Sequence, residues 1–326
     1  MAKARAIVKR RKAVRNIRKI TKTMQMIATA KFQKSLKRAV GTKPYTLKVR
    51  ELVRDLAVSV RNINHPLLRH PTAETRTGVI ALVVVTSNRG LAGAFNGTVL
   101  RMANAFIRAE EQAGNKIDLY AIGKKGIAFF GFQKRPMIVK SEAKDVPSYA
   151  VVDQALQPLL ERFTRGEIDA VHVAYMNFVS TGVQKPEVLK LLPLPSVEEV
   201  AERIAHQTAE KEAQMKAGSL DAKRSGADVR AEVHVAAPGD TIYDFSPSAQ
   251  ELMNELLPLM VKTAFFQTFL DATTSEHVAR MVAMKSATDN ADKMQKALTM
   301  QYNRARQSQI TTELSEIMGG VEAMKG

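Results

Sequence analysis

The sequence predicts a mixed α/β protein: a Rossmann-like domain with a mostly parallel sheet, carrying a long antiparallel coiled coil of N- and C-terminal helices. Two observations lead to this fold class. Residues 77–195 alternate β-branched runs with amphipathic stretches, as strands and helices do around a parallel sheet. Residues 1–62 and 246–320 instead repeat apolar residues at intervals of three and four. We expect residues 196–240 to form a solvated, partly disordered insertion between these parts, with a helix near 197–215.

The N-terminal helix is expected to present a narrow apolar stripe to one partner helix. This stripe consists of Ile7, Val14, Ile17, Ile20, Met24 and Ile27. Gly41 and Pro44 should bend or interrupt the helix, and Pro66 should follow its end.

The central region is expected to supply the sheet. Residues 78–86 form a β-branched run typical of a strand buried on both faces. The other expected strands are 116–122, 137–139 and 170–177, the expected helices are 98–112, 125–130 and 151–165, and an antiparallel hairpin is expected over 178–194.

The C-terminal helix is expected to begin after Ser246-Pro247 and to reach Met318, before Gly319-Gly320. Its length would be on the order of 105 Å at about 1.5 Å per residue, too long for a globular core to cover. Its expected seam toward the N-terminal helix consists of Val278, Met281, Val282, Met284, Leu298, Tyr302, Ile310, Leu314 and Ile317.

The surplus positive charge is confined to one end of the chain. The first 50 residues hold 17 of the 49 Lys and Arg and no acidic residue, so the remainder has 49 − 17 = 32 basic side chains against 32 acidic ones. The C-terminal helix is close to neutral and cannot balance this segment. We therefore expect the N-terminal helix to meet an external acidic surface.

Composition and motifs favour a protein without chemistry of its own. The chain has no Cys, its six His lack metal-ligand spacing, and no G-x-S-x-G is present. Gly90, Gly93 and Gly97 follow a strand but do not spell a dinucleotide fingerprint, which favours a tight turn over a phosphate site. No apolar run approaches the roughly 20 residues that span a bilayer. We expect no catalytic residue, cofactor, metal or direct membrane insertion.

Several motifs, in order along nearly the whole chain, resemble the gamma-subunit family of F-type ATP synthases. They are Ile20-Thr21-Lys22-Thr23-Met24-Gln25-Met26-Ile27-Ala28, Thr86-Ser87-Asn88-Arg89-Gly90-Leu91-Ala92-Gly93, Leu191-Leu192-Pro193-Leu194, Ala279-Arg280-Met281-Val282-Ala283-Met284-Lys285 and Ile310-Thr311-Thr312-Glu313-Leu314. The resemblance starts within a few residues of Met1, and we therefore expect a bacterial protein without a transit peptide.

The resemblance implies a non-catalytic central-stalk rotor that couples transmembrane proton flow to ATP synthesis. It implies contacts with the alpha and beta subunits of the catalytic ring, an epsilon-type subunit and the membrane c-ring, on the cytoplasmic face of a bacterial inner membrane. By motif position, Met24 would lie near acidic loops of the catalytic subunits, and Arg280, Gln307 and Thr311 would make polar contacts with them.

Two alternatives use the same basic segment. It could bind nucleic acid as a phosphate-contacting arm, although Phe32 and Tyr45 are its only aromatic residues and stacking is weakly supported. It could also adhere to an anionic membrane surface as an adaptor.

Overall fold

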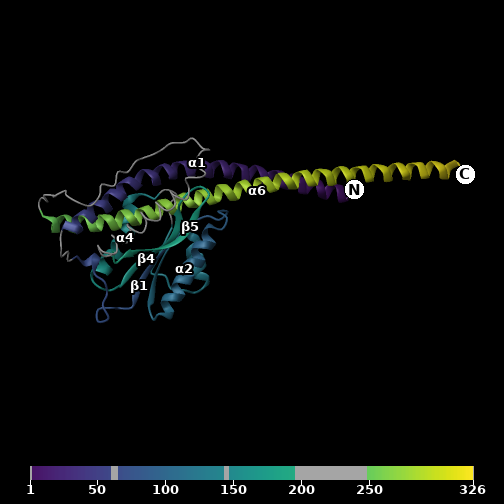
Figure 1. Ribbon diagram of the computed structural model, residues 1–326. Helices are drawn as coiled ribbons and strands as arrows, with labels where there is room; N and C mark the ends of the chain where they lie inside the picture. Colours follow the sequence, from purple (N-terminus) through teal and green to yellow (C-terminus); the bar gives the residue numbers. More distant parts are fainter. Residues whose placement is uncertain (1, 60–64, 143–146, 195–247, 326) are drawn as a thin grey trace, which may run out of the picture.

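The computed structural model describes residues 2–59, 65–142, 147–194 and 248–325. Two long helices, one from each end of the chain, lie side by side, and an α/β domain is attached near one end of the pair (Figure 1). The expected fold class is confirmed. The elements are α1 (Ala2–Ser59), η1 (Pro66–Leu68), β1 (Val79–Val85), α2 (Phe95–Gln112), β2 (Lys116–Ile122), α3 (Lys124–Phe132), β3 (Val139–Ser141), α4 (Tyr149–Thr164), β4 (Ala170–Phe178), β5 (Gln184–Leu192) and α6 (Ala249–Lys325).

The sheet has five strands in the order β3-β2-β1-β4-β5. The first four are parallel, with Ile80 of β1 opposite Ile117 of β2 and Ala170 of β4. β5 is antiparallel to β4. The hairpin expected over 178–194 therefore contributes one further strand, β5. Its other strand is β4, which ends at Phe178.

Each face of the sheet is covered by helices. Ala81, Val83 and Val85 of β1 pack in one cluster with buried residues of α4 and α6, and Leu82 and Val84 pack in the opposite cluster with α2 and α3. This alternation explains why β1 is apolar at every position. α6 is thus both a layer of the domain and one half of the helix pair.

Both long helices continue through residues that were expected to break them. α1 is helical through Gly41 and Pro44, and α6 through Pro258 and Gly319-Gly320 to Lys325. The interruption at Pro44 and the end at Met318 were wrong predictions. An internal proline costs a helix about 3 kcal/mol. Around Pro44, the residues Ala39, Thr46 and Val49 are buried where α1 packs on α6, and burial of this kind works against that cost. The expected N-cap at Ser246 and the stretch 196–240 lie outside the described residues.

The face that α1 buries differs from the expected apolar stripe. Ile17, Ile20 and Ile27 are 52%, 59% and 52% exposed. The buried positions recur instead at intervals of three, four and seven, as in a coiled coil. They are Val14, Thr21, Ala28, Phe32, Ala39, Thr46, Val49 and Val53. The expected stripe was right at Val14, which is buried, and in part at Ile7 and Met24, which are half-buried; it was wrong at the three exposed isoleucines. Half of the buried positions are Thr or Ala, and such residues do not register as apolar periodicity.

The expected seam of α6 is right in its first part only. Val278 and Met284 are buried, and Met281, Leu298 and Tyr302 are half-buried. The remaining expected positions, Val282, Ile310, Leu314 and Ile317, are exposed. The last three lie where α6 extends past the N-terminus of α1 (Figure 1).

Candidate functional surface on the helix pair

Polar contacts fix the register of the helix pair. Thr288 Oγ1 donates a hydrogen bond to Thr21 Oγ1 at 2.8 Å, inside the seam. Arg18 forms an ion pair with Asp292, and the Arg11 guanidinium lies 4.9 Å from the centroid of the Tyr302 ring. The partner on α6 moves toward the C-terminus as the residue on α1 moves toward the N-terminus, so the helices are antiparallel, as expected.

An aromatic contact ties the helix pair to the sheet. The Phe32 and Phe178 rings have centroids 6.2 Å apart, and both side chains cluster with Val278. These residues belong to α1, β4 and α6 respectively. Three elements from distant parts of the sequence therefore meet where the pair leaves the domain.

A second contact joins the glycine-bearing turn after β1 to α6. Arg280 is only 9% exposed; it pairs with Glu276 at 2.7 Å and donates a hydrogen bond to the Gly90 carbonyl at 3.4 Å. Gly93 has φ of +56°, and a Cβ added there would lie 3.8 Å from the Ala283 Cβ. The space beside Ala283 would admit a Cβ, so the left-handed φ of Gly93, and not crowding by α6, accounts for this glycine.

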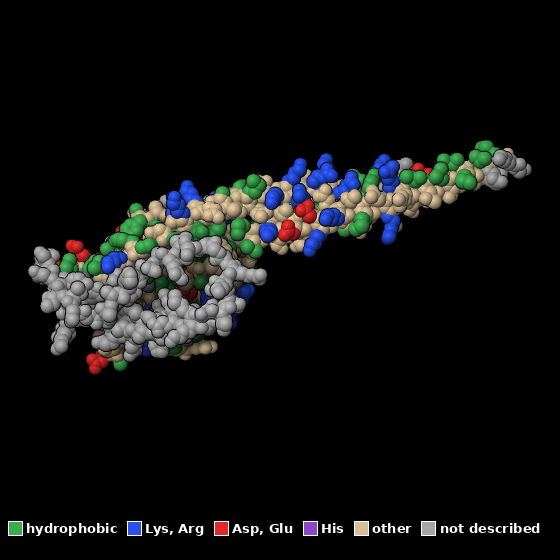
Figure 2. Space-filling model, turned by 45° about the horizontal axis from the view of Figure 1, so that its top comes forward, with side chains coloured by type: hydrophobic (Ala, Val, Ile, Leu, Met, Phe, Trp, Pro, Cys, Tyr) green, Lys and Arg blue, Asp and Glu red, His purple; other side chains and the backbone are tan. Residues whose placement is uncertain are grey.

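The outer face of α1 is strongly basic. Arg10, Lys12, Arg15, Lys19 and Lys22 are all exposed. Figure 2 shows Lys and Arg side chains along the helix pair and few acidic ones. Because exposed like charges repel, this face is stabilised by an acidic surface brought against it.

Past the end of α1, α6 is a single helix with an apolar stripe. From Ile310 onward every side chain of α6 that the structure describes is exposed. Figure 2 shows hydrophobic side chains gathered at this end. The exposed apolar residues are Ile310, Leu314, Ile317, Met318, Val321 and Met324. An exposed apolar stripe of six residues on one helix is typical of a surface that binds another protein.

The four residues singled out from the sequence lie at three separate places. Met24 is half-buried on α1, and Arg280 is buried against the turn. Gln307 and Thr311 are exposed neighbours on α6, where Thr311 Oγ1 donates to the Gln307 carbonyl at 3.0 Å. Arg280 and Gln307 are 27 residues apart on one helix, or about 40 Å.

Sequence reasoning missed the polar residues of the seam. Thr21 and Thr288 meet inside the seam, and Arg18 and Asp292 pair at its exposed edge, yet none of these residues was proposed as a contact. The seven-residue spacing of Val14, Thr21 and Ala28 was the available signal, and it requires small and polar residues to be counted with apolar ones.

Features of other functional classes are missing from the part of the chain that is described. No group of three or more His, Asp and Glu could hold a metal ion there. Within the same ranges, the helices all lack a stretch long and apolar enough to cross a membrane.

Comparison with known proteins identifies the family. A family model described as ATP synthase matches residues 3–324. The ATP synthase gamma chain of Rhodopirellula baltica is 38% identical over 329 residues, covering 100% of both chains. The ATP synthase gamma chain of Leptospira biflexa is 36% identical, covering 99% of this chain and 100% of the relative.

Solved structures share the fold. A chain of the Euglena gracilis mitochondrial ATP synthase (OSCP/F1/c-ring, rotational state 3) has a TM-score of 0.61 at 16% identity, covering 99% of this chain and 95% of that one. A chain of the Tetrahymena thermophila mitochondrial ATP synthase central stalk/c-ring has a TM-score of 0.53 at 18% identity, with 82% and 99% covered. Full-length relatives above 30% identity, together with the family model, lead to one conclusion: the chain belongs to the ATP synthase gamma-chain family.

Proposed function

We propose that this chain is the central-stalk rotor of an F-type ATP synthase and couples transmembrane proton flow to ATP synthesis. One observation carries the proposal: a helix pair with a basic outer face and an unpaired apolar end projects from an α/β domain, in a chain of the gamma-chain family. The basic N-terminal segment also suggested nucleic-acid binding. Membership of the gamma-chain family explains this segment as part of the stalk, so the nucleic-acid alternative is not needed. The chain contributes no catalytic group; it acts by its shape and its surface.

The geometry suits a shaft that turns inside a ring. The helix pair would run up the centre of alternating alpha and beta subunits, with the α/β domain outside. Because the two helices end at different heights and carry charge unequally, each rotational position presents a different face to each catalytic site. Exposed ion pairs are worth only about 0–1 kcal/mol each, so contacts of this kind can be exchanged as the shaft turns.

The individual contacts are proposals of the same kind. Met24 lies beside the basic face of α1, where it would meet acidic loops of the catalytic subunits. Gln307 and Thr311 lie on the unpaired part of α6, which leaves their side chains accessible to the ring. Arg280 holds the turn at Gly90, so its contact with a catalytic subunit would be made beside that turn.

The remaining partners follow from the same assembly. The α/β domain, with part of α1, would meet an epsilon-type subunit and the membrane c-ring. The complex would be peripheral on the cytoplasmic face of a bacterial inner membrane. We propose that the functional divisions are the N-terminal coiled-coil segment 1–62, the domain 77–195, the insertion 196–240 and the C-terminal helix from 246, which is paired in a coiled coil only up to about Ile310.

Co-purification tests the assembly. The chain should purify from native membranes in a fixed ratio with a ring of ATPase subunits; recovery as a free monomer would contradict the proposal.

Coupling tests the contacts. In the reconstituted complex, Gln307→Ala should lower proton pumping per ATP hydrolysed several-fold, while Gln301→Ala, an equal change on an exposed position of the same helix, should not. Arg280→Ala should also lower coupling while the domain stays folded. Normal coupling in both Arg280→Ala and Gln307→Ala would exclude these contacts.

A further inference from the structure

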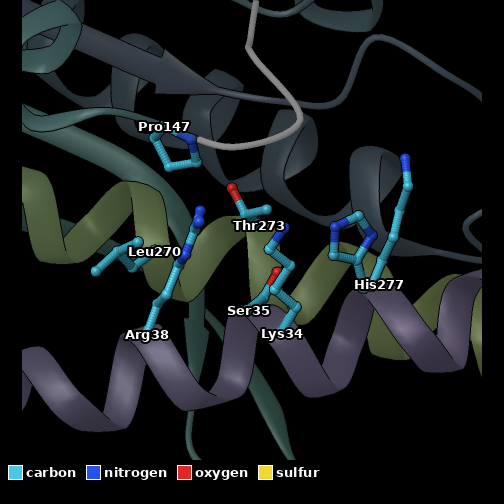
Figure 3. Close-up of a pocket in the computed structure, with 8 residues that line it drawn as sticks. Lys34, Ser35, Arg38, Pro147, Leu270, Thr273 and His277 are labelled. Atoms are coloured by element: carbon cyan, nitrogen blue, oxygen red, sulfur yellow. The ribbon is translucent and has the colours of Figure 1, made fainter.

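A basic cavity lies between α1 and α6 beside the domain. It has a volume of about 250 Å³ and is lined by Lys31, Lys34, Ser35, Arg38, Pro147, Leu270, Thr273 and His277. The three cations are three and four residues apart on α1, so they share one face of that helix. Figure 3 shows Lys34 and Arg38 extending from α1 toward the side on which Pro147 lies.

Two of the three cations at this cavity, Lys34 and Arg38, carry charge that no carboxylate among the described residues balances. None of its lining residues is acidic. Within the described ranges, neither Lys34 nor Arg38 has an ion-pair partner, and both are exposed. On α6, Asp271 accepts a hydrogen bond from Gln267 and Glu276 pairs with Arg280, and neither carboxylate forms an ion pair with Lys34 or Arg38.

A hydroxyl group in the cavity is also unused. The hydroxyl oxygens of the other threonines of α6 lie within hydrogen-bond distance of a carbonyl of their own helix, as that of Thr274 does to Leu270 at 2.7 Å. Thr273 makes no such bond to any described residue, and its side chain is directed toward Pro147 (Figure 3). The Ser35 hydroxyl likewise has no bond to a described residue.

We infer that this cavity binds a phosphate group, carried by free phosphate or by a nucleotide. Phosphate oxygens accept hydrogen bonds only, and the lining offers an ammonium, a guanidinium and two hydroxyls, all able to donate. The concave shape favours a compact anion over a flat acidic surface, and the volume of about 250 Å³ lies below the usual range of about 300–1,000 Å³ for pockets that enclose drug-sized ligands. Such an anion would bridge Lys34 and Arg38 of α1 to Thr273 of α6. This inference does not depend on rotation.

Titration of the purified full-length chain tests the inference. At fixed ionic strength, calorimetry with inorganic phosphate and with ADP should show saturable binding, and adenosine should not bind. The unfolding temperature should rise with phosphate, because a ligand that binds only the folded state stabilises it. If phosphate binds, ADP does not, and the substitutions described below weaken phosphate binding, the ligand is free phosphate. If ADP binds more tightly than phosphate and the same substitutions weaken ADP binding, the ligand is a nucleotide.

The variants remove charge without disturbing the core. Lys34→Gln and Arg38→Gln should each weaken binding about tenfold, the effect of one charge-assisted hydrogen bond. Lys22→Gln, which removes the same charge from an exposed position of the same helix, should change affinity less than twofold. The inference is overturned by absence of saturable binding, by equal affinity in all variants, by an equal loss in Lys22→Gln, or by binding of an acidic peptide alone.

Discussion

Thr21 and Thr288 place their hydroxyl oxygens 2.8 Å apart in the seam between α1 and α6, and both side chains are buried. Each hydroxyl also lies within hydrogen-bond distance of a carbonyl of its own helix, at Arg18 and Met284. The pair therefore joins two helix backbones through side chains 267 positions apart in the sequence.

Replacing one partner of this pair should weaken the helix pair modestly. Thr288→Val keeps the shape of the side chain and removes one interhelical hydrogen bond, while Thr21 keeps its bond to Arg18. The free energy of unfolding should fall by about 0.5–1.5 kcal/mol. Urea unfolding of the single and double Thr21→Val and Thr288→Val variants measures the coupling. Thr312→Val, on the unpaired end of α6, is the control; additive effects of the two seam changes would show that the bond contributes nothing.

Gly123 should tolerate no side chain. Its φ is +97°, and a Cβ added there would lie 2.2 Å from the backbone oxygen of Thr86. Gly123→Ala should therefore destabilise the domain by at least about 3 kcal/mol, through strain and displacement of β1. Gly41→Ala has open space around it and lies inside α1, so it should stabilise by about 0.5–1 kcal/mol. Thermal unfolding followed by circular dichroism distinguishes the two, and equal effects would contradict this account.

His172 should make stability depend on pH. Burial, with a smaller contribution from Lys190, lowers the pKa of His172 to about 4. The unfolded chain takes up this proton near pH 6.5 and the folded chain only near pH 4, so stability falls as pH decreases through that window. Between pH 7.5 and 5.0 this residue should cost about 2 kcal/mol.

The variant His172→Phe removes that contribution and can pack against Phe106, whose ring centroid is 4.8 Å from the imidazole. Urea midpoints at the two pH values should differ less in this variant than in the wild type. His70→Gln, at an exposed position, should keep the wild-type dependence. An unchanged pH dependence in His172→Phe would show that His172 is not responsible.

The unpaired end of α6 should be protected only by a partner. A helical segment as short as residues 312–325 is only marginally stable in water when nothing packs on it. In the free chain, amides of residues 312–325 should exchange hydrogen within seconds, while residues 284–298, which pair with α1, stay protected. In the assembled complex both segments should be protected, as mass spectrometry can follow. Slow exchange of 312–325 in the free chain would contradict the expected need for a partner.

The sequence predicted the sheet better than the seam. β2 was predicted at its observed bounds because an apolar run between turn residues has few other interpretations. The α1 seam was misplaced because Thr21 and Ala28 are not apolar enough to mark a stripe, while exposed Ile17 and Ile20 are. Continuity through Pro44 depends on contacts with α6, which local propensity does not contain.

The candidate surface was predictable in part. The four-residue spacing of Gln307 and Thr311 places them together on any helix, and the structure does so. The burial of Arg280 against Gly90 could not be read from the sequence, because it depends on how the turn after β1 meets α6. The roles of these residues depend on surfaces of other chains, which this sequence does not encode.

A single helix passes through three surroundings: the domain core around Met253 and Phe265, the seam around Thr288, and solvent beyond Ile310. No loop interrupts it between them. Torque applied to the domain therefore reaches the free end through one helical backbone, although Pro258 has no N–H and leaves out one rung of the hydrogen-bond ladder within the domain. Compliance resides in bending and twisting of the helix itself, and it is greatest where α1 no longer braces α6. We therefore expect α6 to be stiffest where the domain core surrounds it, less stiff where only α1 packs against it, and least stiff beyond Ile310, where it is unpaired.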